Sequence, residues 1–204
     1  MSKLYDFVDI IENYSQYLPT EIVKICKRKR NPKRDFLFVN SMQGKHLHVD
    51  PAKCFAIYDE LVKQIVRKID GNEKVVVIGF CETATAIGHY IASSLSNCIY
   101  YMQTTRESKL IKANSILDFK EEHSHATEQM LYGDVENLKN CDRIVFVDDE
   151  ISTGKTILNF IAAIESLGIH KEYGVASLLN WQNDEWSKKF SSMNIDTYCI
   201  LRGN

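Results

Sequence analysis

Two nearly continuous apolar runs, KVVVIGF at residues 74–80 and RIVFVDD at 143–149, constrain the fold more than any other feature of the sequence. A strand without alternating apolar and polar residues is buried on both faces, which is typical of a parallel sheet covered by helices on each side. The similar runs EYGVASLL at 172–179 and NCIYYM at 97–102 predict two further strands of this sheet.

Apolar residues at helical spacing fill the intervals between these runs. Residues 51–70 begin with a proline and repeat apolar side chains three or four positions apart, and residues 82–95 do the same. The same spacing runs from Ile157 to Leu167, and Gly168 is placed to end that helix. Strands that alternate with helices predict an α/β fold: an open, mostly parallel sheet flanked by helices, with right-handed crossovers.

Two segments do not follow this alternation. Residues 1–50 predict a helix, followed by the basic stretch KICKRKRNPKR at 24–34 and a short strand at 35–40. Residues 104–135 form a long polar connection, in which we expect a helix at about 121–131. Long connections in compact domains are often binding loops or lids.

Length and composition indicate a single domain. The 204 residues are 45% hydrophobic, and we divide them into a hood at 1–50, a core at 51–180 and a C-terminal segment at 181–204 that adds a strand or part of the hood.

A formal net charge of -2 indicates neither a nucleic acid nor a membrane as partner. Six cysteines without a CxxC pair favour a reduced protein over a disulfide scaffold or zinc site. Since no apolar run reaches roughly 18 residues and the N-terminus lacks a signal-peptide pattern, we expect a cytoplasmic location.

The stretch VDDEISTGKT at 147–156 ends like a nucleotide-binding P-loop, but its acidic beginning favours another ligand. The P-loop pattern GxxxxGK[ST] requires a glycine where this chain has Asp149. A carboxylate there would repel a triphosphate, and the tight turn would lack its glycine. We therefore reject a P-loop kinase.

The same stretch suits a ligand that carries one phosphate beside vicinal hydroxyls. A buried strand brings Asp148, Asp149 and Glu150 to its carboxyl end, where open α/β sheets bind their ligands. The helix that begins near Gly154 offers backbone N–H groups to a phosphate monoester. Carboxylates suit ribose hydroxyls or a hydrated Mg²⁺. Phosphoribosyl pyrophosphate (PRPP) combines a 5-phosphate, ribose hydroxyls and a magnesium-bound pyrophosphate.

The stretch IVFVDDEISTGKT resembles the PRPP-binding motif of the type I phosphoribosyltransferases, which consists of an apolar strand, two acidic residues, a small-residue loop and Thr-Gly-x-Thr. The resemblance implies that Asp148 and Asp149 hold the ribose hydroxyls and contact Mg²⁺ only indirectly, and that the following loop wraps the 5-phosphate. Glu150 departs from the pattern, because many members have an apolar residue there. The implied PRPP-binding residues are Asp148, Asp149, Glu150, Ile151, Ser152, Thr153, Gly154, Lys155 and Thr156.

Three stretches, DDEISTG, GFCETATAIGH and EEHSHAT, are more similar to a subgroup of bacterial phosphoribosyltransferase-like proteins. Members of this subgroup are associated with tellurium-resistance and stress-response gene clusters. The resemblance covers roughly residues 45 to 180 and implies no particular substrate.

The loop after the first core strand is a second candidate part of the site. In the family this loop binds pyrophosphate through backbone amides, and Phe80, Cys81, Glu82 and Thr83 occupy its place here. These residues are also explained as the start of a helix with Glu82 in its first turn.

The connection at 104–127 takes the place of the family's mobile catalytic loop. Besides Asp149, our catalytic candidates are Arg106, which would stabilise the charge leaving on pyrophosphate, and His123 and His125, which would bind pyrophosphate or move a proton. A solvated polar helix start explains the histidines nearly as well.

Two other segments have open alternatives. Lys45 and His46, in GKHLHVDP at 44–51, either line the site or belong to a plain surface turn. Trp181 either stacks on a ring of the substrate or is an aromatic core residue.

The sequence thus predicts an enzyme that uses Mg–PRPP to make or cleave an N-glycosidic bond to a nucleobase or a base-like acceptor. The alternative is a regulator that keeps the PRPP or nucleotide site without the chemistry and binds RNA through residues 24–34. We expect small molecules as substrates and no membrane partner. Because dimers are common in the family, the resemblance is also compatible with a homodimer.

Overall fold

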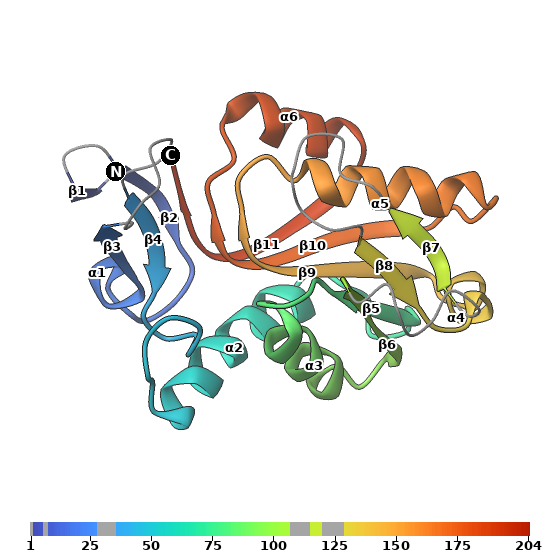
Figure 1. The fold of residues 1–204 in the computed structure, drawn as a ribbon, viewed down its shortest axis with the longest axis horizontal. Coiled ribbons are helices and arrows are strands. Elements are labelled where there is room, and N and C mark those ends of the chain that lie inside the picture. The colour runs from blue at the N-terminus through green and yellow to red at the C-terminus, as the bar shows by residue number, and fades with distance from the viewer. Residues whose placement is uncertain (1, 6–7, 28–35, 107–114, 120–128) are drawn as a thin grey trace.

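The computed structural model of the chain describes residues 2–5, 8–27, 36–106, 115–119 and 129–204. These residues form a nine-stranded sheet with helices on both faces and a separate two-stranded sheet (Figure 1). The strands of the large sheet are β1 (Ser2–Tyr5), β2 (Val8–Asn13), β5 (Val75–Gly79), β6 (Cys98–Thr105), β7 (Ser115–Phe119), β8 (Gln129–Tyr132), β9 (Arg143–Ile151), β10 (Glu172–Asn180) and β11 (Ile195–Gly203). The two-stranded sheet consists of β3 (Val23–Lys27) and β4 (Phe36–Asn40). The helices are α1 (Pro19–Ile22), α2 (Pro51–Val66), α3 (Thr85–Ser94), α4 (Val135–Asn140), α5 (Lys155–Ser166) and α6 (Asp184–Ser192).

The middle of the large sheet is parallel, as the alternation of strands and helices predicts. The order of these strands is β11-β10-β9-β5-β6. Antiparallel strands extend the sheet at both sides: β2 pairs with β11, and β8 pairs with β6. The predicted α/β fold, an open and mostly parallel sheet flanked by helices, is confirmed.

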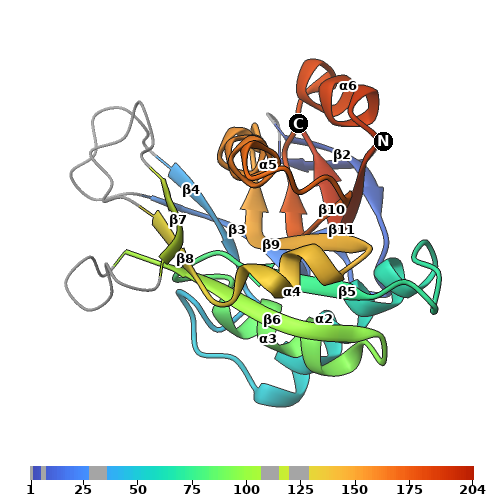
Figure 2. The same ribbon diagram turned by 90° about the vertical axis from the view of Figure 1, so that its right-hand side faces the viewer.

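The central strands carry apolar residues on both faces because helices cover both faces of the sheet (Figure 2). On β9, Val145 and Val147 pack in the core under α2 and α3, whereas Ile144 and Phe146 pack in the core under α5. All residues of β5 are buried. Each fully buried aliphatic side chain stabilises the fold by about 1.5–3 kcal/mol, so these strands fix the position of the loops that follow them.

The helices predicted at 51–70, 82–95 and 157–167 are present as α2, α3 and α5, with bounds that differ by a few residues. The Asp50 side chain caps α2 by accepting a hydrogen bond from the Ala52 backbone N–H at 2.9 Å. In the parts of the chain that the structure describes, no helix combines the length and apolar character needed to cross a bilayer.

The segment predicted as a hood at 1–50 divides in the structure, because β1 and β2 join the large sheet. From here on, the name hood means only the small unit of α1, β3, β4 and the loop at 41–50. It lies beside the end of β11 and the segment that follows β10 (Figure 1). Phe38 of β4 stacks on Trp181, with ring centroids 4.5 Å apart. The predicted strand at 35–40 is observed as β4.

The predicted N-terminal helix is wrong for the described residues. Val8–Asn13 form strand β2, and only the four residues of α1 are helical in this segment. Val8 and Ile10 are buried on one face of β2, which pairs with β11. This alternation of buried positions is that of a strand, and the partner strand lies at the other end of the chain. The basic stretch begins in β3, and its residues 28–34 lie outside the described parts.

The predicted helix at 121–131 is wrong where the structure describes it. Residues 129–131 belong to β8, in which Met130 and Leu131 are buried. The backbone of β8 pairs with β6 on one side and with β7 on the other. Such tertiary pairing readily overrides local helix preference. Residues 120–128 lie outside the described parts.

Candidate functional site

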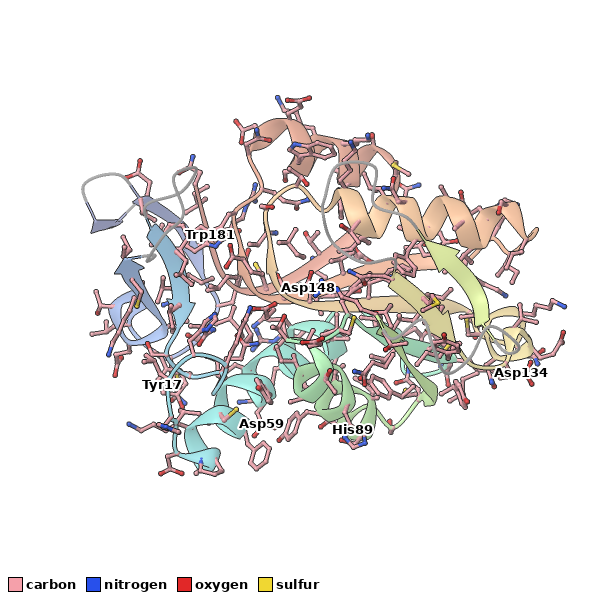
Figure 3. All side chains as sticks on the ribbon, in the orientation of Figure 1. Tyr17, Asp59, His89, Asp134, Asp148 and Trp181 are labelled. Atoms are coloured by element: carbon pink, nitrogen blue, oxygen red, sulfur yellow. The ribbon has the colours of Figure 1, made fainter. Side chains whose placement is uncertain are left out.

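Asp148 and Asp149 lie near the carboxyl end of β9 (Figure 3 labels Asp148). β9 has β5 on one side and β10 on the other, in parallel register. The segments that follow these three strands therefore meet at one edge of the sheet, where α/β proteins bind their ligands. The sheet topology brings together the two stretches that the sequence analysis identified, at 80–83 and 148–156.

Asp149 is the centre of a contact network between the sheet and the hood. Its Oδ2 accepts a hydrogen bond from Lys45 Nζ at 2.7 Å, and its Oδ1 accepts one from the Thr83 hydroxyl. The Asp149 side chain is 11% exposed and that of Lys45 is 30% exposed. Neighbouring side chains of a strand point to opposite faces, so Asp149 lies on the same face as Val147, towards α2 and α3.

Asp148 lies on the opposite face of β9, the face of Phe146. Burial raises the pKa of the Asp148 carboxyl well above its usual range, and the nearby charge of Asp149 raises it further. A hydrogen bond from the Asp149 backbone N–H to Asp148 Oδ1, at 2.8 Å, and the charge of Lys45 act in the opposite direction. A carboxyl with a strongly raised pKa at the ligand-binding edge of a sheet is typical of a functional site.

The predicted pyrophosphate loop reaches Asp149 through one of its four residues, Thr83. Phe80 belongs to the core and packs edge-on against Phe160, with ring centroids 5.1 Å apart. Cys81 is buried, and its peptide bond to Glu82 is cis. Glu82 is exposed. The backbone, rather than most of the side chains, is thus what this loop offers to a ligand.

Buried polar contacts hold this loop from two sides. The Cys81 backbone N–H donates a hydrogen bond to the Thr104 hydroxyl at 2.9 Å, and Thr104 is fully buried in β6. On the hood side, Gln43 Nε2 donates to the Thr83 carbonyl at 2.9 Å. Gln43 is 8% exposed. The loop is therefore fixed to both the sheet and the hood.

The segment after β9 turns sharply into α5. Gly154 has a φ of 70°, in the left-handed region that favours glycine, and α5 begins at the next residue. The other predicted phosphate-binding residues differ in exposure: Ser152, Thr153 and Lys155 are exposed, Glu150 and Thr156 are half-buried, and the side chain of Ile151 is in the core. Ile151 can therefore contribute only its backbone.

The segment after β10 supports the turn at Gly154. This support was not predicted from the sequence. Gln182 Nε2 donates a hydrogen bond to the Thr153 carbonyl at 3.3 Å. The ring of Phe190, in α6, lies against Gly154. Gln182 comes two residues after a parallel strand, and the carboxyl ends of these strands meet at one edge of the sheet. Its position in the sequence could therefore have indicated that it lies near the site.

The remaining candidates are Arg106, His123, His125, Lys45, His46 and Trp181. Arg106 is exposed and follows β6 directly. His123 and His125 lie outside the described residues, so their roles stay predictions. Lys45 contacts Asp149, so of its two alternatives it lines the candidate site and is not part of a plain surface turn. His46 is exposed. Trp181 stacks on Phe38 and belongs to the edge of the core.

Across the described ranges, no group of three or more His, Cys, Asp or Glu side chains could hold a metal ion. Mg²⁺ usually keeps several waters and is bound by one or two carboxylates together with the phosphates of a substrate. Asp148 and Asp149 fit this mode.

Comparison with known proteins agrees with this arrangement of strands and loops. The sequence profile of a family described as phosphoribosyl transferase matches residues 22–203. No curated protein matches the sequence.

Solved structures of phosphoribosyltransferases share the fold at low sequence identity. Adenine phosphoribosyltransferase from Trypanosoma brucei, in complex with AMP, pyrophosphate and ribose-5-phosphate, is 19% identical with a TM-score of 0.64, covering 93% of this chain and 82% of that one. The adenine enzyme from Rhodothermus marinus is 16% identical with a TM-score of 0.61, covering 90% and 95%. Orotate phosphoribosyltransferase from Aeropyrum pernix is 14% identical with a TM-score of 0.55, covering 89% and 88%. With the family profile spanning most of its length, the chain belongs to the phosphoribosyl transferase family of enzymes.

Proposed function

We propose that this enzyme uses Mg–PRPP as phosphoribosyl donor and makes or cleaves an N-glycosidic bond to a nucleobase or base-like acceptor. One observation carries the proposal: a carboxylate pair at the end of β9 is followed within a few residues by a glycine-dependent turn that opens a 12-residue helix. Carboxylates accept hydrogen bonds from hydroxyls, and a helix start binds a phosphate, so the ligand carries both groups close together.

Each part of the site has a role in this proposal. Asp148 and Asp149 hold the ribose hydroxyls, and residues 152–156 bind the 5-phosphate through backbone N–H groups, hydroxyls and the Lys155 ammonium. The backbone of residues 80–83 binds the pyrophosphate. The hood closes the site above them, since it already contacts both Thr83 and Asp149.

The proposed reaction breaks the bond between ribose C1 and a pyrophosphate oxygen, and forms a bond between C1 and a nitrogen of the acceptor. The electron pair of the broken bond leaves with pyrophosphate, and the acceptor nitrogen loses its proton. Bound Mg²⁺ supplies charge neutralisation at the pyrophosphate oxygens. The protein mainly positions the two reactants and stabilises the leaving charge, for which Arg106 is our candidate. Attack from the face opposite to pyrophosphate inverts the configuration at C1.

The acceptor is a separate question. Adenine phosphoribosyltransferases are among the structures that share this fold, so adenine is the first acceptor to test, followed by the other nucleobases.

Calorimetric titration with Mg–PRPP, and with Mg–ATP as the competing ligand, tests the proposal. We expect saturable PRPP binding in the micromolar range, about -8 kcal/mol, and little binding of ATP. The double variant Asp148→Asn/Asp149→Asn should lose at least about a hundredfold in affinity, because each charge-assisted hydrogen bond contributes roughly 1.5–3 kcal/mol.

A matched control removes two carboxylates elsewhere. Glu136→Gln/Glu165→Gln changes the net charge equally at α4 and at the far end of α5, and it should bind PRPP like the wild type. Binding of ATP alone, or of neither ligand, would contradict the proposal. PRPP binding without release of pyrophosphate in the presence of any acceptor would favour the regulator instead.

A further inference from the structure

An ion pair occupies the middle of the proposed PRPP site. Lys45 of the hood and Asp149 of β9 are 104 positions apart in the sequence, and Lys45 Nζ lies 2.7 Å from Asp149 Oδ2. The other carboxylate oxygen, Oδ1, accepts the hydrogen bond from Thr83. The Asp149 side chain is only 11% exposed, and each of its carboxylate oxygens already accepts a hydrogen bond. A ribose hydroxyl that approaches Asp149 therefore competes with one of these partners for the carboxylate.

Thr83 is the partner that stays. Its carbonyl accepts the hydrogen bond from buried Gln43, and the preceding Cys81 is bonded to buried Thr104. These backbone contacts hold Thr83 beside Asp149, and a shift of the loop away from Asp149 would disturb both of them. Leaving such buried polar groups without partners costs about 1–3 kcal/mol each.

Lys45 is the partner that can move. It lies on the tip of the hood loop, where residues 44–48 are all exposed. Both ends of this tip are anchored: the Gln43 carbonyl accepts a hydrogen bond from the Tyr58 hydroxyl at 3.3 Å, and Asp50 caps α2. Gly44, with a φ of 78°, begins the tip. The tip can therefore shift between fixed ends without any loss of core packing.

Space is available beside the hood loop. A hollow of about 450 Å³ lies between the hood and the start of α2. Its lining includes Met42 and His48, on either side of Lys45 in the chain, but neither Lys45 nor Asp149. The loop is therefore not packed on both sides.

The displaced ammonium group would find a new partner on the substrate. In PRPP the pyrophosphate is attached to C1, the carbon next to the one that carries the 2-hydroxyl. A hydroxyl that takes the place of Lys45 on Asp149 thus brings phosphate oxygens within reach of the same flexible side chain. A lysine ammonium is a mobile point charge that binds phosphate readily.

We propose that Lys45 exchanges between Asp149 in the free enzyme and the pyrophosphate group in the PRPP complex. This inference rests on the proposed function, since it concerns the same site. Lys45 then distinguishes an activated phosphoribosyl donor from an unactivated phosphoribose: both displace it from Asp149, but only PRPP offers it a new anionic partner. Lys45 returns to Asp149 once both pyrophosphate and the phosphoribose-bearing product have left.

Titration of Lys45→Met with two ligands, each in the presence of Mg²⁺, tests the exchange. Ribose 5-phosphate, which lacks pyrophosphate, should bind at least about threefold more tightly to the variant, because it no longer competes with the ammonium group for Asp149. PRPP should bind at least about tenfold more weakly, because a charge-assisted contact is lost. Lys45→Arg should restore most of the PRPP affinity.

Lys53→Met is the matched control. Lys53 lies in the first turn of α2 and lines the hollow, and its removal changes the net charge equally. Both affinities of this variant should stay within about twofold of the wild type. Equal weakening of both ligands by Lys45→Met would overturn the exchange in favour of a general electrostatic effect. Unchanged affinities, or tighter binding of both ligands, would overturn it as well. If the wild type binds neither ligand, the proposed function itself fails.

Discussion

The ring of Phe190, in α6, fills the space that a Cβ atom on Gly154 would occupy. Gly154 also has a φ of 70°, and Gln182 Nε2 would lie 3.2 Å from the same Cβ. The turn that opens α5 is therefore shaped by the segment that follows β10. The two segments meet because β9 and β10 are parallel neighbours.

We expect Gly154→Ala to damage both stability and ligand binding. The left-handed backbone strains any residue with a Cβ atom, and the buried Phe190 ring must shift as well. The free energy of unfolding should fall by about 1–3 kcal/mol, measured by urea denaturation. The affinity for PRPP should fall at least about tenfold, because the backbone N–H groups of the turn lose their alignment.

Two other glycines separate the causes of this effect. Gly168 has a φ of 76° with nothing within 4 Å of an added Cβ, so Gly168→Ala measures backbone strain alone. Gly71 has open space around it and no positive φ, so Gly71→Ala should be nearly neutral. If Gly154→Ala costs no more than Gly168→Ala, Phe190 does not shape the turn.

Asp148 should make the protein less stable as pH rises. Its pKa is raised in the folded protein, mainly by burial, above the value of about 3.9 expected in the unfolded chain. Between these two pKa values the folded state binds more protons than the unfolded state, so the free energy of unfolding decreases with increasing pH. Below the unfolded value both states are protonated, and this contribution to stability is fully present.

Asp148→Asn should remove this part of the pH dependence. The variant should gain stability relative to the wild type as pH rises above about 4, which urea denaturation between pH 4 and 8 would measure. Asp184→Asn, at an exposed position in the first turn of α6, shows the effect of removing an ordinary carboxylate. Curves for wild type and Asp148→Asn that stay parallel over this range would refute the prediction.

The central part of the fold could be predicted from local sequence, but the edges could not. Strands β5, β9 and β10 carry apolar residues on both faces, and such short apolar runs favour buried parallel strands. β2 and β8 are short and contain polar residues, and they are strands because of their partners. Since β2 pairs with β11 from the opposite end of the chain, a local pattern at residues 8–13 does not reveal it.

The site was predictable to the extent that it lies in one contiguous stretch. Asp148, Asp149 and Gly154 follow a recognisable strand, and their place at the sheet edge follows from topology alone. Lys45 and Gln182 reach the site from distant segments, and only the packing of hood and sheet decides what they contact. Gly154 predicts a tight turn, but the role of Phe190 in shaping it depends on α6, which no pattern in the sequence suggested.

At the opposite end of β9, Arg143 should matter for stability and not for the site. It is 8% exposed, its Nε lies 2.6 Å from Glu73 Oε2, and its Nη1 lies 2.8 Å from Asp196 Oδ2. Arg143→Met leaves two partly buried carboxylates without their cation, so the free energy of unfolding should fall by about 2–4 kcal/mol. Arg143 is the first residue of β9, whereas Asp149 lies near its last, so the PRPP affinity of the folded protein should be unchanged.

Arg67→Met is the control for Arg143→Met. Arg67 is exposed at the end of α2, and its removal should cost less than about 1 kcal/mol. If Arg143→Met lowers PRPP affinity under conditions where the protein is fully folded, the two ends of β9 are coupled, and the prediction is wrong.

Arg106 should affect catalysis more than binding. It is exposed and directly follows β6, the strand beside β5, so it lies at the edge of the sheet where the proposed pyrophosphate loop begins. A cation that acts on the leaving pyrophosphate stabilises charge that develops in the transition state. Arg106→Ala should therefore lower kcat about a hundredfold or more, with only a few-fold change in the Kd for PRPP. Arg106→Lys should recover part of kcat, because it keeps the charge but not the planar guanidinium.

The ratio of these two effects decides the role of Arg106. Steady-state kinetics with pyrophosphate release as the readout gives kcat, and calorimetry gives the Kd for PRPP. Equal losses in affinity and in kcat/KM, with kcat unchanged, would mean that Arg106 binds the substrate and its transition state equally well. Arg106 would then bind the pyrophosphate without being catalytic. Another cation would have to stabilise the leaving group, and among the described residues Lys45, which contacts Asp149, is the candidate.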